Sequence, residues 1–148
     1  MKIECADVAE TMAVGRRLAP LLRPGDVVLL AGRLGAGKTV FVSGIAEGLG
    51  IDAPITSPSF VLVRTYQGFL GMTHADAYRL GSFGELWDLG LEETVGDGVL
   101  VVEWGNVVDS AFGEDALVVN IEVGSDDART ISFEARGSWR ARALEELA

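Results

Sequence analysis

The feature that most constrains this chain is the segment GRLGAGKT at residues 32–39. It matches the pattern G-x-x-x-x-G-K-[ST], in which a lysine and a hydroxyl residue follow a glycine-rich loop. The segment comes after the apolar run VVLLAG (27–32) and opens the helical pattern KTVFVSGIAEGLG (38–50). A strand, a loop and a helix in this order form the context that a phosphate-binding loop requires, whereas a chance glycine-rich turn before a lysine needs no such context.

The residue types in the loop fit a nucleotide polyphosphate. Gly35 and Gly37 can adopt backbone angles that other residues resist, so that consecutive N–H groups, including that of Ala36, can turn inward around an anion. The N-terminus of the following helix adds its dipole. Lys38 would place a compact positive charge on the β- and γ-phosphates, and Thr39 would offer a hard oxygen ligand to Mg²⁺.

Such a site also needs a carboxylate that holds or orients the metal ion. Glu103 follows the apolar run GVLVV, and Asp76 lies in THADAYRL after a second apolar run. Ligands of open α/β sheets bind outside the carboxyl ends of the strands. This position favours Glu103 as the metal-side carboxylate and Asp76 as a nucleotide-side group. The alternative is a plain surface acid, because the chain has 22 acidic residues.

Three further features have a plain structural interpretation, which we take as the default. His74 shares a strand face with Asp76 at a two-residue spacing, but a lone histidine is more often structural. Trp104 could line a nucleotide or partner surface, although packing in the core is favoured. The hydroxyls of TSPSF (56–60) could sense a metal ion or a γ-phosphate, but a capped turn fixed by proline explains the segment better.

The remaining pattern predicts an α/β fold, a single P-loop domain over residues 1–148. Strand–helix alternation followed by a strand-rich end favours a mostly parallel central sheet with antiparallel additions, flanked by helices. The 49% hydrophobic content can fill a core. We expect helices at 7–22, with Asp7 as N-cap, at 38–50, closing near Gly48 or Gly50, and at 138–148. Strands are expected within 27–32, 57–66, 69–80, 98–104, 116–123 and 129–135.

Charge and cysteine content narrow the class of protein. The formal net charge of −10 disfavours direct binding to a nucleic-acid backbone. The single cysteine, Cys5, cannot form an internal disulfide, which favours a reducing cytosol, and with one histidine it is too little for a Cys/His zinc site. The start MKIECADVAE has no signal-peptide core, and no apolar run approaches a membrane span. The sequence therefore predicts a cytoplasmic protein.

Several motifs together point to one family. GRLGAGKTVF, SPSF, HADAYRL, GLEE and VVEWG occur in the order and spacing of the bacterial TsaE family, also called YjeE-type P-loop ATPases, which the chain closely resembles as far as about Arg129. The resemblance implies a protein that binds and hydrolyses ATP and is needed for the threonylcarbamoyl modification of the tRNA adenosine next to the anticodon. It also implies docking on a TsaD–TsaB pair, in which TsaD performs the transfer and the partners hold the tRNA.

The resemblance assigns roles to individual residues. Lys38 and Thr39 match the phosphate lysine and the metal threonine, and Glu103 matches the metal-side glutamate. Asp76 matches an aspartate proposed to act near the γ-phosphate, and residues 57–60 match a switch-like loop in which Ser59 stands for the usual threonine. The implied nucleotide-binding set is Gly35, Ala36, Gly37, Lys38, Thr39, Val40, Trp104 and Arg129.

The chain also departs from the family pattern. Arg33 stands where aspartate is common, Val40 replaces a second threonine, and Gly105 replaces a proline. None of these changes removes a group that the basic chemistry requires. Arg33 could alter the charge next to the nucleotide or a partner contact.

Two other functions use the same loop. A small metabolite or nucleotide kinase would need a lid with several arginines, whereas the arginines here are scattered and no lid insertion is visible. A switch that binds nucleotide without hydrolysing it stays open as an alternative. Since no motif positions an arginine finger or a glutamine, we expect slow hydrolysis by the isolated protein and acceleration by a partner.

Overall fold

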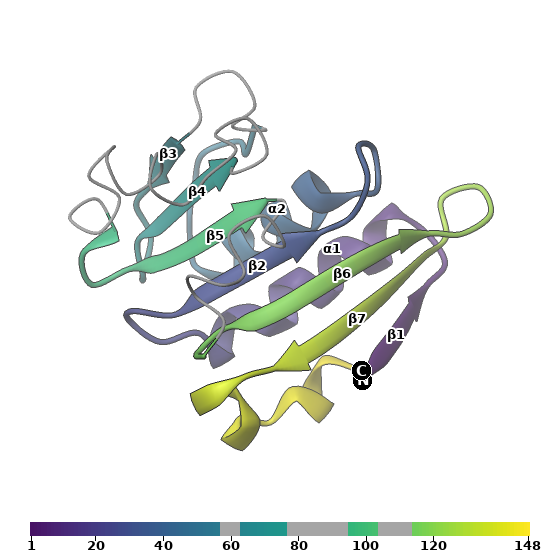
Figure 1. Cartoon of the computed structure of the whole chain (residues 1–148). Coiled ribbons are helices and arrows are strands. Elements are labelled where there is room, and N and C mark those ends of the chain that lie inside the picture. The colour runs from purple at the N-terminus through teal and green to yellow at the C-terminus, as the bar shows by residue number, and fades with distance from the viewer. Residues whose placement is uncertain (57–62, 77–94, 104–113) are drawn as a thin grey trace.

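Seven strands form one mixed sheet in the computed structural model, which describes residues 1–56, 63–76, 95–103 and 114–148 (Figure 1). The strands are β1 (Lys2–Cys5), β2 (Val27–Ala31), β3 (Val63–Tyr66), β4 (Met72–Asp76), β5 (Val99–Glu103), β6 (Leu117–Val123) and β7 (Arg129–Ala135). The helices of these ranges include α1 (Val8–Leu18), α2 (Lys38–Gly48) and the short 3₁₀ helices η1 (Ala19–Leu21), η4 (Gly137–Ala141) and η5 (Leu144–Leu147).

The sheet has the order β1-β7-β6-β2-β5-β4-β3. Its central strands β6, β2, β5 and β4 run parallel, and β7, β1 and β3 are antiparallel additions at the two sides. The predicted α/β domain with a parallel centre is therefore confirmed. Because the central strands share one direction, the loop after β2 lies at the same edge as Asp76 and Glu103, which end β4 and β5.

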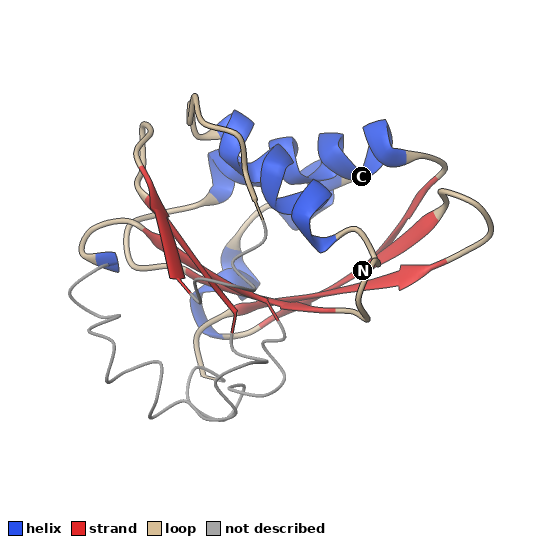
Figure 2. Ribbon diagram, turned by 90° about the horizontal axis from the view of Figure 1, so that it is seen from above, coloured by secondary structure: helices blue, strands red, loops and turns tan. Residues whose placement is uncertain are grey.

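The main hydrophobic core lies between the sheet and the two longer helices. Most of the helical ribbon is on one side of the strands (Figure 2). Leu30 of β2 packs in this core with Phe41 and Ile45 of α2. Leu29, on the opposite face of β2, belongs to a smaller cluster with Leu100 of β5. Burial on both faces explains the continuous apolar runs of these strands. No helix among the described residues is long and apolar enough to cross a membrane.

Helices α1 and α2 contact each other through their backbones. A Cβ atom at Gly15 would overlap with the carbonyl oxygen of Phe41, and one at Gly44 would overlap with the carbonyl oxygen of Met12. Gly48 lies similarly close to the end of α1. Glycine is required at these positions because no side chain separates the two helices.

The predicted helix ends are confirmed in part. The Asp7 side chain accepts a hydrogen bond from the N–H of Glu10 at 2.9 Å, as an N-cap should. Helix α1 ends at Leu18, earlier than expected, because Pro20 has no N–H and the chain tightens into η1. Helix α2 ends before Gly50, which has a left-handed φ of +74°.

Two segments differ from the sequence prediction. Residues 2–5 were not expected to be a strand, yet they form β1, an antiparallel edge strand paired with β7. The alternation of polar Lys2 and Glu4 with apolar Ile3 and Cys5 was the available signal, and the prediction did not use it. The prediction of a terminal helix at 138–148 is wrong. The segment forms the short helices η4 and η5, and Arg142 between them has an extended backbone.

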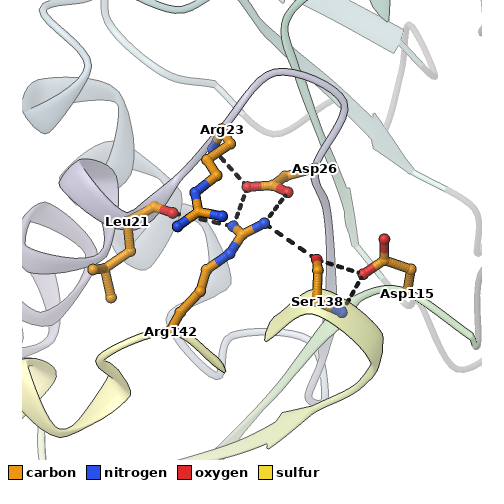
Figure 3. Close-up of polar contacts among 6 residues, drawn as sticks. All are labelled: Leu21, Arg23, Asp26, Asp115, Ser138 and Arg142. Atoms are coloured by element: carbon orange, nitrogen blue, oxygen red, sulfur yellow. Dashed lines mark hydrogen bonds and ion pairs between the residues drawn. The ribbon is translucent and has the colours of Figure 1, made fainter. Parts of the chain in front are cut away.

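Contacts of Arg142 explain the interrupted helix (Figure 3). Its guanidinium forms a two-pronged ion pair with Asp26, in which Nη2 is 2.8 Å from Oδ1. Both side chains are at least nine-tenths buried. The guanidinium also lies 4.0 Å from the centre of the Trp139 ring, and Ser138 donates to Asp115 at 2.8 Å. These contacts fasten the C-terminal segment to the turn before β2, far from the carboxyl edge of the sheet.

Candidate nucleotide-binding site

The loop between β2 and α2 has the backbone that the sequence predicted. Gly35 and Gly37 have φ values of +81° and +104°, in the left-handed region that favours glycine. The N–H of Ala36 donates to the carbonyl of Arg33 at 3.0 Å, which closes a tight turn. Helix α2 begins at Lys38, directly after this turn. Because the first N–H groups of an α-helix have no partner within the helix, those at the start of α2 can bind an anion held in the loop.

The side chain of Lys38 folds back against the loop, and the residue is only 6% exposed. Its Nζ donates to the carbonyl oxygen of Gly32 and, at 3.3 Å, to that of Arg33. Burial lowers the pKa of Lys38, while the charges of Glu103 and Asp76 act in the opposite direction. The ammonium group is therefore held by backbone carbonyls that a phosphate could replace, and the charges of both carboxylates favour its protonated form.

Asp76 and Glu103 are paired residues of β4 and β5. Each is 3% exposed. Glu103 in turn pairs with Leu30 of β2, so the two carboxylates lie on the first and second strands away from the strand that leads into the loop. The structure thus brings together the lysine and the two acids that the sequence singled out. Burial of such charges is stable only when opposite charges or hydrogen bonds accompany them.

His74 lies closer to these acids than its default structural interpretation suggested. It is fully buried, and its Nε2 is 3.6 Å from Oε2 of Glu103. Within the ranges that the structure describes, neither ring nitrogen has a hydrogen-bond partner. The two-residue spacing from Asp76 was the available signal, and it places both side chains on the face that carries Glu103.

The first turn of α2 offers the predicted metal oxygen. Thr39 and Val40 are half-buried there, and the carbonyl of Thr39 accepts a hydrogen bond from Ser43 at 2.9 Å. No group of three or more His, Cys, Asp or Glu side chains among the described residues could hold a metal ion alone. The Thr39 hydroxyl and the Glu103 carboxylate fit Mg²⁺, which keeps several waters and combines one or two carboxylates with phosphate oxygens of the substrate.

Arg129 reaches the loop from the first position of β7. Its Nε donates to the carbonyl of Ala36 at 2.8 Å, and its Nη1 donates to the carbonyls of Asp126 and Ala128 at 3.1 and 2.8 Å. The register that pairs it with Val123 at the end of β6 explains this reach, because it sets Arg129 at the carboxyl edge of the sheet. Trp104, Gly105, the loop 57–60 and the motif at 90–93 lie outside the described residues.

The fold and the loop place this chain among α/β proteins with a phosphate-binding loop. The family described as "Threonylcarbamoyl adenosine biosynthesis protein TsaE" matches residues 5–131. The chain belongs to the TsaE family.

Relatives of known name resemble the chain over nearly its whole length. The "tRNA threonylcarbamoyladenosine biosynthesis protein TsaE" of Bacillus subtilis is 40% identical over 149 residues, which cover 99% of this chain and 93% of that protein. The protein of the same name from Streptomyces coelicolor is 43% identical over 145 residues, covering 91% and 97%. The crystal structure of YdiB from Bacillus subtilis superposes with a TM-score of 0.78 at 38% identity, covering 99% of this chain and 93% of that one.

Proposed function

We propose that this chain is a Mg²⁺-dependent ATPase required for the threonylcarbamoyl modification of the tRNA adenosine next to the anticodon. In this proposal residues 1–148 act as one P-loop ATPase domain on a TsaD–TsaB complex. The observation that carries it is the Lys38 side chain, buried against the carbonyls of the glycine-rich loop, at the sheet edge where the buried Asp76 and Glu103 end their strands. The names of the TsaE relatives support the pathway.

Each residue of the site has a defined task in this proposal. Lys38 exchanges its carbonyl partners for the β- and γ-phosphates, while the N–H groups of the loop and the first helical turn surround the phosphate chain. Thr39 and Glu103 hold Mg²⁺, which neutralises charge that develops on the phosphate oxygens. Asp76 lies beside Glu103, where it can orient a group that approaches the terminal phosphate.

The same geometry leads us to expect slow hydrolysis by the isolated protein. Arg129 contacts the loop, but its Nε and Nη1 donate to backbone carbonyls. In this geometry those groups are not directed at a γ-phosphate. A group supplied by a partner can accelerate such reactions by roughly 10³–10⁵. We therefore expect the TsaD–TsaB complex to stimulate turnover.

The net charge supports an indirect role toward tRNA. A chain with a formal charge of −10 repels a phosphate backbone on most of its surface. We propose that the partners hold the tRNA and that this protein contributes the nucleotide-dependent step.

Phosphate release from Mg-ATP tests the proposal. The purified protein is measured alone and with a purified TsaD–TsaB pair, with Lys38→Ala as the matched variant. Stimulation by the pair that disappears in the variant is the expected result. Nucleotide binding without phosphate release, even with the pair, would replace the ATPase by a nucleotide-dependent switch. A labelled phosphate on a small acceptor would indicate a kinase instead.

A further inference from the structure

The contact between Arg129 and Ala36 links two parts of the chain that are far apart in sequence. The donor is the Nε of Arg129, the acceptor is the carbonyl oxygen of Ala36, and the distance is 2.8 Å. Ala36 is 1% exposed, so water cannot readily replace the donor. The same Nε would lie 3.7 Å from a Cβ atom at Gly37. The guanidinium thus lies against the Ala36–Gly37 peptide.

The orientation of this peptide determines where an N–H group points. The chain has no cis peptide bond among its described residues. In a trans peptide the carbonyl and the following N–H point in opposite directions. A carbonyl of Ala36 that faces Arg129 therefore directs the N–H of Gly37 away from Arg129. Gly37 has no Cβ atom, which permits its left-handed φ and leaves this peptide with few steric restraints of its own.

Arg129 is itself held by the turn between β6 and β7. Its Nη1 donates to the carbonyls of Asp126 and Ala128, which lie in the β6–β7 turn. That turn is closed by hydrogen bonds between Gly124 and Ala128 and between Ala128 and Ser125. The turn and the loop after β2 lie at the same edge of the sheet (Figure 1). A guanidinium can bridge the two because its donors are fixed in one plane.

We infer that Arg129 is a positioning residue that holds the Ala36–Gly37 peptide with the Gly37 N–H directed at bound phosphate. This inference rests on the proposed nucleotide site and gives Arg129 a role through the loop backbone rather than on the nucleotide. The β6–β7 turn serves as the fixed support. Without Arg129 the Ala36–Gly37 peptide is free to rotate. Only the fraction of molecules with the Gly37 N–H in the binding orientation then binds phosphate, which lowers the apparent affinity.

The test uses the full chain and measures Mg-ADP and Mg-ATP affinity by calorimetry for wild type and for Arg129→Met. We expect the variant to lose about tenfold in affinity, as for one hydrogen bond to a charged group, and to lose it equally for both nucleotides. The amide resonance of Gly37 should shift strongly on Mg-ADP addition in wild type and much less in the variant. Arg129→Lys, which keeps one donor, should recover part of both effects.

Arg17→Met is the matched control. The Nε of Arg17 also donates to a backbone carbonyl, that of Leu147, at 2.9 Å, but away from the loop. It should leave the affinity and the Gly37 resonance unchanged, and melting curves without nucleotide show whether each variant is folded. Wild-type affinity and a wild-type Gly37 shift in Arg129→Met would overturn the inference. A loss confined to Mg-ATP would also overturn it, because it would indicate direct contact with the γ-phosphate.

The proposed function fails in a different way. If wild type does not bind either nucleotide, or if Lys38→Ala binds them as wild type does, the nucleotide site itself is wrong and the inference falls with it. If wild type binds and Lys38→Ala does not, only the Arg129 variants decide the inference.

Discussion

Asp76 and Glu103 occupy paired positions on the adjacent parallel strands β4 and β5, so that two buried carboxyl groups end side by side at one edge of the sheet. Two like charges in such a place repel each other, and a nearby cation offsets this repulsion. The ammonium of Lys38 is that cation, since both acids act on its pKa. A change at either acid should therefore alter the pKa of Lys38.

Glu103→Gln should abolish most of the Mg²⁺-dependent hydrolysis, by about 10²-fold or more, because it removes the metal-side charge at nearly constant volume. Phosphate release measured against Mg²⁺ concentration, with the partner complex present, checks this. Glu47→Gln is the control, since that side chain is 57% exposed on α2. Hydrolysis at the wild-type rate in Glu103→Gln would place the metal elsewhere.

Asp76→Asn should lower the maximal rate of hydrolysis without changing the Mg²⁺ concentration at which hydrolysis reaches half of its maximal rate. The reason is that Asp76 lies one strand farther from β2 than Glu103 does. The same titration separates the two acids. Equal shifts of the Mg²⁺ dependence in both variants would show that both carboxylates hold the metal.

Nucleotide binding should take up protons at alkaline pH. Burial lowers the pKa of Lys38 in the free protein, and a bound phosphate favours the charged ammonium and raises it again. Between these two pKa values binding protonates Lys38, so the affinity falls as the pH rises through this range. Calorimetry in two buffers of different ionisation enthalpy measures the uptake. Lys38→Met should show none, and equal uptake in that variant would assign the proton to another group.

The same shift affects folding stability. Because the folded-state pKa of Lys38 lies below its unfolded value of 10.5, the unfolded chain binds the proton more tightly. The contribution of Lys38 to the free energy of unfolding therefore rises with pH, from the lowered pKa up to 10.5. Urea unfolding at several alkaline pH values should show this rise in wild type relative to Lys38→Met. A parallel pH dependence of both proteins would contradict it.

Arg142→Met should lower the free energy of unfolding by about 3–5 kcal/mol, because it leaves the Asp26 carboxylate buried without its partner. The exposed pair between Arg16 and Glu47 offers a contrast, since Arg16→Met should cost less than about 1 kcal/mol. Urea unfolding measures both. Nucleotide affinity should be unchanged in Arg142→Met, and a weakened affinity would show that the C-terminal segment supports the loop.

Gly44→Ala should destabilise the protein by about 1–3 kcal/mol or more, because the new methyl group would overlap with the backbone of α1. Gly71→Ala is the matched control, since a Cβ there meets only the carbonyl oxygen of Tyr66 at 3.8 Å. Thermal unfolding compares the two. Equal melting temperatures for both variants would mean that the helices can separate at little cost.

Sequence reasoning found the parts of the site that depend on local chemistry. The roles predicted for Gly35, Gly37 and Lys38 follow from backbone freedom and charge within a few residues, and the two glycines have the expected left-handed φ values while Lys38 is buried. Asp76 and Glu103 were found because each ends an apolar run, and the parallel direction of their strands then brings them together.

Contacts between distant residues could not be predicted in this way. The extended conformation of Arg142 depends on Asp26, more than a hundred residues earlier in the chain. Strand β1 likewise depends on pairing with β7, which is more than a hundred residues later. The bond from Arg129 to Ala36 depends on the register of β7 against β6. No local pattern of hydrophobic residues contains this information.

From the backbone contact between α1 and α2 we expect the two helices to behave as one cooperative unit. Since no layer of side chains lies between Gly44 and α1, neither helix can slide or open while the other stays in place. In native-state hydrogen exchange their amides should open together, at one free energy. Opening of α2 should therefore also expose the amides of α1. Phosphate bound at one end of α2 would slow exchange along the whole of α1.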